Sequence, residues 1–282
     1  MPHLKAVPGV VFRSFVTGSG LTSRAVGLRY GALMCTSDYR EVIVDPEVDA
    51  VLIATRHDLH APMVAEAIEA GKHVFVEKPL ALNEEQLAPV EATYKKAAIS
   101  GSGAPQLLVG FNRRFSPLAL QMKEALAQGR LVMNYRVNAS PVPAGHWHQD
   151  AEQGGGRIVG EICHFIDVMQ YLTSAEPVEV FAMATLDGDR RSADPDNLVI
   201  NLTFTEGSVG TIAYVSAGDP SYPKERLEVF GGGMVGVIDN WRTLRVQGNG
   251  RRVKKRYWLG TEKGHEQEMK LFVSSIRNGH PT

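Results

Sequence analysis

Short apolar runs alternate with helix-like segments along the first part of the chain. The run DAVLIAT at 49–55 is apolar at nearly every position, and HVFVEKP at 73–79 is apolar until its last three residues. A strand that is apolar on both faces is typical of a parallel sheet covered by helices. Between these runs, Val64 and Ile68 stand at helical spacing. The repetition of strand and helix predicts a doubly wound α/β domain over residues 1–115.

Turn and cap residues predict where some of these elements begin and end. Thr22 or Ser23 should cap the helix that follows an apolar strand at 11–18, and Gly31 should end it. The segment QLLVGFNRRF, residues 106–115, should form the last strand of the domain.

The pattern changes after residue 115. The segment NLVINLTF alternates apolar and polar positions, and Glu206 and Gly207 form a turn into another such segment. Alternation of this kind predicts a large, mostly antiparallel sheet with one face covered and the other open. We therefore expect a second domain at 116–282. The inward positions are Leu198, Ile200, Leu202 and Phe204.

Composition and charge limit the partners of the protein. The chain has 282 residues, of which 44% are hydrophobic, and its 30 basic and 31 acidic side chains leave a net charge of -1. This balance predicts no general attraction to nucleic acid or membranes. The cations of RRVKKR at 251–256 are expected on a solvated hairpin or a guarded sheet edge. Two distant cysteines and the lack of a long apolar run predict a soluble cytoplasmic protein.

A glycine-rich turn that could hold a dinucleotide is not found near the start of the chain. Dinucleotide-binding domains begin with a strand, G-x-G-x-x-G and a helix. The similar piece here is TGSGLTSR at 17–24, which follows the strand that normally handles the adenosine ribose. It is either a flexible turn or part of a cofactor site. In the second case, Ser19, Thr22 and Arg24 favour a 2′-phosphate, and therefore NADP over NAD.

Three segments together resemble one family. They are DPEVDAVLIATRHDLHAPMVAEAIEAGKHVFVEKPLALN (45–83), VGFNRRFSPL (109–118) and GGGRIVGEICHFIDVMQYL (154–172). Their order and spacing resemble the glucose-fructose oxidoreductase, inositol dehydrogenase and rhizopine-catabolism (Gfo/Idh/MocA) family. The resemblance implies a Rossmann domain that binds NAD or NADP, followed by a domain for substrate binding and for assembly into dimers or tetramers through its open sheet. It also implies chemistry on a hydroxyl or keto group of a sugar, cyclitol or nucleotide-sugar.

The resemblance also bears on the missing glycine turn. LKAVPGV at 4–10 is similar to the end of the first helix in relatives. We therefore expect the chain to begin inside that helix, without the first strand and the glycine-rich loop. Such a chain would lose most of its pyrophosphate contacts.

Lys78 is the first candidate catalytic residue. Hydride transfer needs a group that takes the hydroxyl proton and a positive charge that stabilises a developing alkoxide, and a lysine can supply either. Glu77, Lys78 and Pro79 stand where a parallel strand ends, which is the ligand edge of an open α/β sheet. The resemblance implies that Lys78 contacts both the substrate hydroxyl and the nicotinamide. It also implies that the peptide bond between Lys78 and Pro79 is cis and aims the lysine. The alternative is an ordinary surface ion pair.

His164 and Glu161 are the second candidates, on a helix expected at about 157–172. They stand three apart, on a face different from the apolar stripe of Ile162, Phe165, Ile166 and Met169. The resemblance makes His164 the active-site histidine. The resemblance implies an aspartate four residues earlier, where this chain has Gly160; either Glu161 supplies the carboxylate from the next position, or the acid that orients His164 is lost. The alternatives are a structural histidine and, less in keeping with the spacing, a metal ligand pair; we predict no metal.

Supporting site residues are expected at other strand ends and in one loop. The loop AGHWHQD could place Trp147, with His146 and His148, over a sugar face, or Trp147 could anchor the loop in the core. An arginine at 113 or 114 could hold a substrate phosphate or carboxylate. His60 is more a helix-start packing residue than a catalyst. The predicted cofactor contacts are Ser19, Arg24, Ala54, Thr55, Arg56, His60, Glu77, Lys78 and Asn112, and the predicted substrate contacts are Arg113, Arg114, Trp147 and His164.

The leading interpretation is an NAD(P)-dependent oxidoreductase with Lys78 and His164 at the reaction centre. A protein of another class, a sugar-binding or scaffold protein that has lost dinucleotide binding, is the alternative. Dinucleotide affinity distinguishes the two.

Overall fold

The computed structural model describes residues 2–99, 105–126, 129–143, 145–186 and 193–279. The chain divides into two compact units, 1–110 together with 266–282, and 111–265. In the part that is described, no helix is long and apolar enough to cross a membrane.

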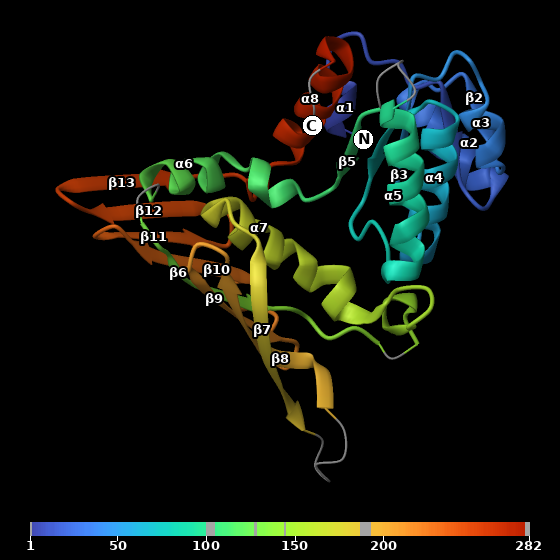
Figure 1. Cartoon of the computed structure of the whole chain (residues 1–282). Helices are drawn as coiled ribbons and strands as arrows, with labels where there is room; N and C mark the ends of the chain where they lie inside the picture. Colours follow the sequence, from blue (N-terminus) through green and yellow to red (C-terminus); the bar gives the residue numbers. More distant parts are fainter. Residues whose placement is uncertain (1, 100–104, 127–128, 144, 187–192, 280–282) are drawn as a thin grey trace. The chain divides into compact units, whose positions relative to one another are not determined.

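The first unit consists of short parallel strands connected by helices (Figure 1). Helices α4 and α5 pack on β3, β4 and β5 through a core that includes Val64, Ile68, Val74, Val76 and Val90. The strands are β1 (Ser14–Val16), β2 (Met34–Thr36), β3 (Ala50–Ile53), β4 (His73–Val76) and β5 (Leu107–Val109). The helices are α1 (Pro2–Lys5), α2 (Gly20–Tyr30), α3 (Tyr39–Ile43), α4 (His60–Glu69), α5 (Glu84–Ile99) and α8 (His265–Asn278).

The parallel strands form two separate sheets, β1-β2 and β3-β4-β5. In a dinucleotide-binding sheet of order 3-2-1-4-5-6, β2 and β1 take places 3 and 2, and β3 to β5 take places 4 to 6. Place 1 lies between the two sheets, and none of the described strands occupies it. Val51 and Leu52 are therefore only half-buried, although the run 49–55 predicted burial on both faces. The prediction of a Rossmann-type sheet without its first strand is therefore confirmed for the described residues.

Two predicted boundaries in the first unit were wrong. Ser19, and not Thr22 or Ser23, caps α2, because Ser19 has an extended backbone and its hydroxyl accepts from the Thr22 amide. Ser23 is instead buried in the first turn and donates to the Gly20 carbonyl. The strand predicted at 106–115 ends at Val109, and residues 112–115 form a 3-10 turn.

The second unit is an eight-stranded sheet with α6 (Pro117–Ala125) and α7 (Cys163–Thr173) on one face (Figure 1). The order is β13-β12-β11-β10-β6-β9-β8-β7, and only the β6–β9 pair is parallel. The four inward positions predicted at 198–204 are buried, and so are Tyr135 and Trp241. The strands are β6 (Val132–Asn138), β7 (Pro177–Leu186), β8 (Ala193–Phe204), β9 (Val209–Val215), β10 (Glu225–Gly231), β11 (Met234–Asp239), β12 (Thr243–Gly248) and β13 (Arg251–Arg256).

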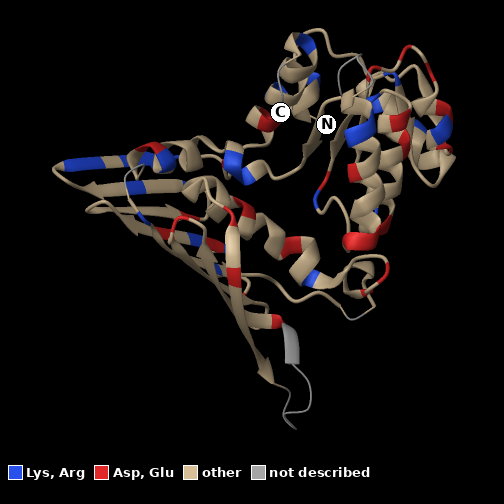
Figure 2. Cartoon of the chain, viewed as in Figure 1, with Lys and Arg blue, Asp and Glu red and all other residues tan. Residues whose placement is uncertain are grey.

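The basic run at 251–256 is the edge strand β13, at the end of the β12–β13 hairpin (Figure 2). This agrees with the predicted guarded edge, since charged side chains on an edge strand oppose pairing with other chains.

The unit boundaries differ from the predicted domain boundaries in two ways. The first unit ends at Gly110 and not at residue 115, because the 3-10 turn at 112–115 packs with the second unit. Residues 266–282 belong to the first unit, where the Phe272 ring meets the Phe75 ring edge-on at 5.9 Å. The roles assigned to the two domains remain predictions.

We expect Phe272→Ala to destabilise the first unit by about 3–5 kcal/mol, because it leaves a cavity against Phe75. Lys270→Ala on the exposed face of α8 removes only an i,i+4 pair with Glu266 and should cost less than about 0.5 kcal/mol. Urea unfolding followed by far-UV circular dichroism measures both. Equal midpoints for the two variants would contradict the packing role of α8.

Candidate functional site

Lys78 lies at the carboxyl end of the parallel pair β3–β4. The Glu77 amide donates to the Ile53 carbonyl (2.9 Å), and the chain then leaves the sheet. Lys78 is half-buried, and its bond to Pro79 is cis, as the resemblance implied. At the neighbouring end of β3, Ala54, Thr55 and Arg56 are exposed. The structure thus brings these predicted residues together at the ligand edge of the sheet.

Glu77 is held in a confined place beside Lys78. Burial raises the pKa of Glu77, while Lys78 and His60 act in the opposite direction. Gly110 permits the close approach of the chain after β5, because a Cβ at this position would lie 3.1 Å from Glu77 Oε2 and 3.3 Å from Glu77 Cα. A side chain at 110 would therefore displace Glu77.

His60 has a different role from the predicted cofactor contact. Its side chain is 0% exposed. The ring atom Nδ1 lies 2.7 Å from the Pro79 carbonyl oxygen, and Nε2 lies 3.2 Å from that of Thr55. Both nitrogens therefore face the protein backbone.

The predicted adenosine side of the site is at the start of α2. The Ser19 hydroxyl caps the helix, the Thr22 hydroxyl lies 3.2 Å from it, and Arg24 is exposed. A helix start with hydroxyls and a free-standing guanidinium fits a phosphate group. The described residues of the first unit thus fit the ribose and nicotinamide ends of a dinucleotide, whereas no G-x-G-x-x-G turn for the pyrophosphate is present among the described residues of that unit.

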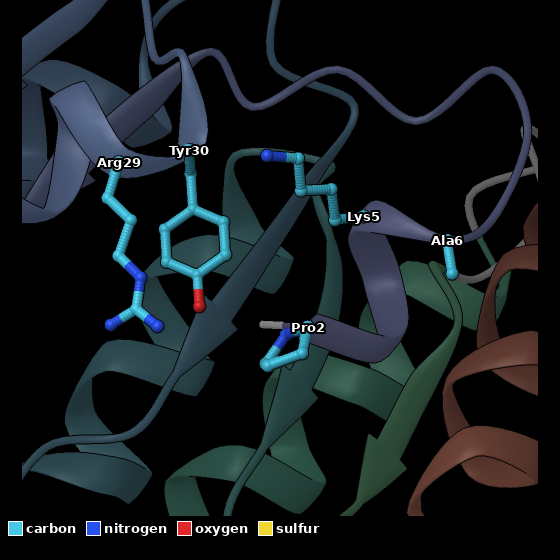
Figure 3. Close-up of a pocket in the computed structure, with 5 residues that line it drawn as sticks. All are labelled: Pro2, Lys5, Ala6, Arg29 and Tyr30. Carbon is cyan, nitrogen blue, oxygen red and sulfur yellow. The ribbon is translucent and has the colours of Figure 1, made fainter.

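A separate hollow of about 370 Å³ lies beside α1 and α2 (Figure 3). Lys5 Nζ and Arg29 Cζ approach the Tyr30 ring centroid at 5.9 Å and 5.7 Å. None of the predicted site residues lines this hollow, so we do not assign the chemistry to it.

His164 lies in the first turn of α7 and is buried. Phe111 meets the His164 ring edge-on at 6.0 Å. The helix predicted at 157–172 begins with a π-helical turn, Ile158–Ile162, and continues as α7. Ile162, Phe165 and Met169 are fully buried, as the predicted stripe required.

Glu161 is the centre of a charged cluster that the sequence analysis did not foresee. Its carboxylate accepts from Lys224 Nζ, from the Tyr214 hydroxyl and from Arg157 Nη2 (3.2 Å). Arg157 Nε also donates to the Tyr214 hydroxyl (2.6 Å), and Nη1 donates to the Ser140 carbonyl (2.7 Å).

This cluster sets the ionisation of Glu161. Burial acts to raise the pKa of Glu161, but the ammonium of Lys224 and the donors around it prevail and lower the pKa to about 2. A carboxylate with so low a pKa is a weak base near neutral pH. We therefore do not keep Glu161 among the proton-transferring groups.

Arg113 is not available to a substrate, contrary to its predicted role. It is 5% exposed and forms a fork with Glu225, in which Nε and Nη2 each donate at 2.8 Å. Glu225 also accepts from Tyr135 (2.8 Å), Trp241 Nε1 (2.7 Å) and Lys263 (2.8 Å). These donors hold the pKa of Glu225 well below its usual range despite burial. The ionised pair fixes the 3-10 turn at 112–115 to β10.

Asn112 and Arg114 are likewise engaged within the second unit. Asn112 is buried, and Nδ2 donates to the Lys263 carbonyl (2.8 Å), which does not support its predicted cofactor contact. Arg114 forks onto the buried Asp167 on α7 through Nε (3.0 Å) and Nη2. A substrate anion would have to compete with this carboxylate, so the predicted anion-binding role of Arg114 stays a prediction.

The aromatic loop at 146–148 is a compact group of rings. The ring centroids of Trp147 and His148 are 4.0 Å apart, and that of His146 lies 5.8 Å from Trp147. Trp147 is half-buried and His146 is exposed, so the group is neither a core anchor nor fully solvated. Gly154 closes the loop, since a Cβ there would lie 2.4 Å from the Trp147 carbonyl oxygen.

No cluster of three or more potential metal ligands occurs among the residues that the structure describes. Comparisons with known proteins indicate the family of this chain. The protein-family model described as "Oxidoreductase family, NAD-binding Rossmann fold" (GFO_IDH_MocA) matches residues 9–99. The family model "GFO/IDH/MocA C-terminal domain" matches residues 120–233. The chain is also 30% identical to the myo-inositol 2-dehydrogenase of Thermotoga maritima over 263 residues, which are 90% of this chain and 77% of that enzyme. This chain belongs to the Gfo/Idh/MocA family.

Two further relatives show how far the likeness extends. The uncharacterized oxidoreductase YrbE of Bacillus subtilis is 31% identical over 75% of this chain, and the match spans 61% of the YrbE length. The crystal structure of a probable dehydrogenase from Thermotoga maritima superposes with a TM-score of 0.78 at 27% identity, and covers 99% of this chain and 85% of that one. The Gfo/Idh/MocA chain therefore has the fold of that crystal structure.

We expect Glu161→Gln to lower the stability of the second unit in a pH-dependent way. Because the folded-state pKa of Glu161 is lowered from 4.5 to about 2, its ionised form stabilises the fold above about pH 4.5, and this contribution is lost as the pH falls towards 2. At pH 7 the shift corresponds to at most about 3 kcal/mol. The difference between wild type and variant should be largest above pH 5 and should shrink by pH 3.

Tryptophan fluorescence in urea isolates this unit, because Trp147, Trp241 and Trp258 all lie in it. The exposed Glu152 is the control, and Glu152→Gln should unfold like the wild type at each pH. A stability loss in Glu161→Gln that is the same at pH 3 and pH 7 would argue against the cluster as the cause.

Proposed function

We propose that this Gfo/Idh/MocA protein is a nicotinamide-dependent oxidoreductase that acts on a hydroxyl or keto group of a sugar or cyclitol. The observation that carries the proposal is the position of Lys78 at the end of a parallel strand in an NAD-binding fold. The myo-inositol 2-dehydrogenase name of one relative supports the substrate class. A nucleotide-sugar remains within this proposal as a larger member of the class.

Lys78 and His164 are the proposed residues of the reaction centre. The bound nicotinamide would supply or accept the hydride. The ammonium of Lys78 would stabilise negative charge on the substrate oxygen, and the imidazole of His164 would take or return the hydroxyl proton. Ala54, Thr55 and Arg56, which are exposed beside Lys78, would contact the cofactor.

The choice of cofactor would be made at the start of α2. Ser19, Thr22 and Arg24 supply hydroxyls and a cation but no acid, which favours a 2′-phosphate and therefore NADP. The family model is described as NAD-binding, so both nucleotides are tested. The aromatic group of Trp147 and His146 would stack on the sugar face. The location proposed is the cytoplasm, because two distant cysteines in the sequence are typical of a reducing compartment.

We expect Lys78→Ala to lower kcat by on the order of 10²- to 10⁴-fold while nucleotide binding persists. Binding is followed by nicotinamide fluorescence with NADH and NADPH, and turnover is assayed with inositols and aldoses. Lys95→Ala, on an exposed helix pair with Glu91, should behave as wild type.

The assay uses these 282 residues and also the longest reading frame that contains them. Wild-type turnover in Lys78→Ala would refute the role of the lysine. If neither nucleotide binds to either protein while a sugar does, the sugar-binding alternative replaces the enzyme.

We also propose a homodimer or homotetramer that forms through the open face of the large sheet. Phe230, Val132 and Val209 lie side by side on β10, β6 and β9 and are 37%, 50% and 42% exposed. Met183 and Val199 add a second apolar pair on β7 and β8. An exposed apolar surface of this kind marks an interface between proteins.

We expect Val209→Arg to shift the protein to monomers, because it places a charge on this apolar surface. Size-exclusion chromatography with light scattering measures the mass. Leu120→Arg, at an exposed apolar position on α6, is the matched control and should keep the wild-type mass. An unchanged mass in Val209→Arg would exclude the open face as the interface.

A further inference from the structure

The side chain of His60 connects the two loops that carry the proposed site residues of the first unit. His60 is the first residue of α4, which connects β3 to β4 along the chain. The strands β3 and β4 are paired neighbours in the sheet. One loop leaves β3 through Thr55, and the other leaves β4 through Lys78 and Pro79. The imidazole reaches a backbone oxygen of each loop, at 3.2 Å for Thr55 and 2.7 Å for Pro79.

The chemistry of these contacts makes His60 the donor. A carbonyl oxygen only accepts, so each contact requires a hydrogen on the ring nitrogen that faces it. A neutral imidazole carries one such hydrogen and can hold one carbonyl at a time. Loss of this donor would leave a buried carbonyl oxygen without a hydrogen bond, which costs free energy. The loop could relieve this cost by moving.

The position of Pro79 determines what such a movement would disturb. The β3–β4 register ends at Ile53 and Val76, and the Glu77 amide still bonds to Ile53. Lys78 therefore lies between a residue tied to the sheet, Glu77, and a residue whose carbonyl faces His60, Pro79. Two fixed flanks restrict the direction in which the lysine side chain leaves the backbone.

We propose that His60 is a positioning residue that holds the turn bearing Lys78 against the end of β3, and that it does not contact the cofactor. This inference rests on the proposed function, in which Lys78 acts on the substrate. A displacement of a reacting group by about 1 Å can cost on the order of 100-fold in rate. A nearby imidazole, His57, packs against His60 with ring centroids 5.7 Å apart and limits its rotation.

Two conservative variants separate the two contacts. In His60→Asn the amide nitrogen takes the place of Nδ1 and can still donate to Pro79, whereas in His60→Gln it takes the place of Nε2 and can donate only towards Thr55. Val64→Ala is the control, because Val64 is fully buried on the same helix and touches the core instead of the loops. Val64→Ala should lower the melting temperature by about as much as the His60 variants do, without moving Lys78.

The first measurement is hydrogen exchange by mass spectrometry on peptides that cover 77–82, which needs no enzymatic activity. His60→Gln should exchange faster in this segment than both His60→Asn and Val64→Ala. The second is steady-state kinetics, in which His60→Gln should lose 10- to 100-fold in kcat with less than about a twofold change in KM for the nucleotide, while His60→Asn retains most of the rate.

The outcomes separate this inference from the proposed function. If the wild type turns over no sugar, the proposed function fails, and the exchange data alone decide whether His60 holds the turn. If His60→Gln exchanges at 77–82 like the wild type, or if Val64→Ala accelerates exchange there equally, the positioning role is refuted.

Discussion

The second unit depends on one buried carboxylate, that of Glu225. It lies on the covered face of the sheet and gathers donors from four places in the sequence, namely Arg113, Tyr135, Trp241 and Lys263. A buried carboxylate is costly unless its charge is compensated and its lone pairs are bonded, and here both conditions are met. The 3-10 turn at 112–115 is thereby tied to the sheet. Phe111, which precedes this turn, packs against His164, so the surroundings of the proposed catalytic histidine follow from the same ion pair.

Glu161 shows the same principle in a more exposed setting. The Glu161 carboxylate is engaged by Lys224, Tyr214 and Arg157. The cluster connects the π-helical turn before α7 to β9 and to the start of β10. Its strong compensation keeps Glu161 ionised and so separates its role from that of a proton carrier. In the proposed reaction, the proton chemistry is left to His164 and Lys78.

At the end of β4 the first unit relies on contacts of the main chain, whereas ion pairs hold Glu161 and Glu225 in the second unit. The end of β4 is held by a ladder bond at Glu77, by the close approach of Gly110, and by the contact of His60 with Pro79. These contacts act on the main chain, so they can direct Lys78 without competing for its charge.

The sequence by itself determined the order of strands and helices, the parallel and antiparallel halves, and the strand end that presents Lys78, because these follow from local periodicity and from turn residues. It also contained an unused indication of Glu225, which stands in register with the inward Leu227 and Val229. Only the tertiary structure decided the fate of Asn112, Arg113, Arg114 and Glu161. Apart from Arg157, which stands four residues before Glu161, their partners lie between 53 and 151 residues away along the chain, and local spacing does not specify such pairs. The charge of an arginine can be read from the sequence, but whether it meets a substrate or a buried carboxylate depends on which segments the folded chain brings together.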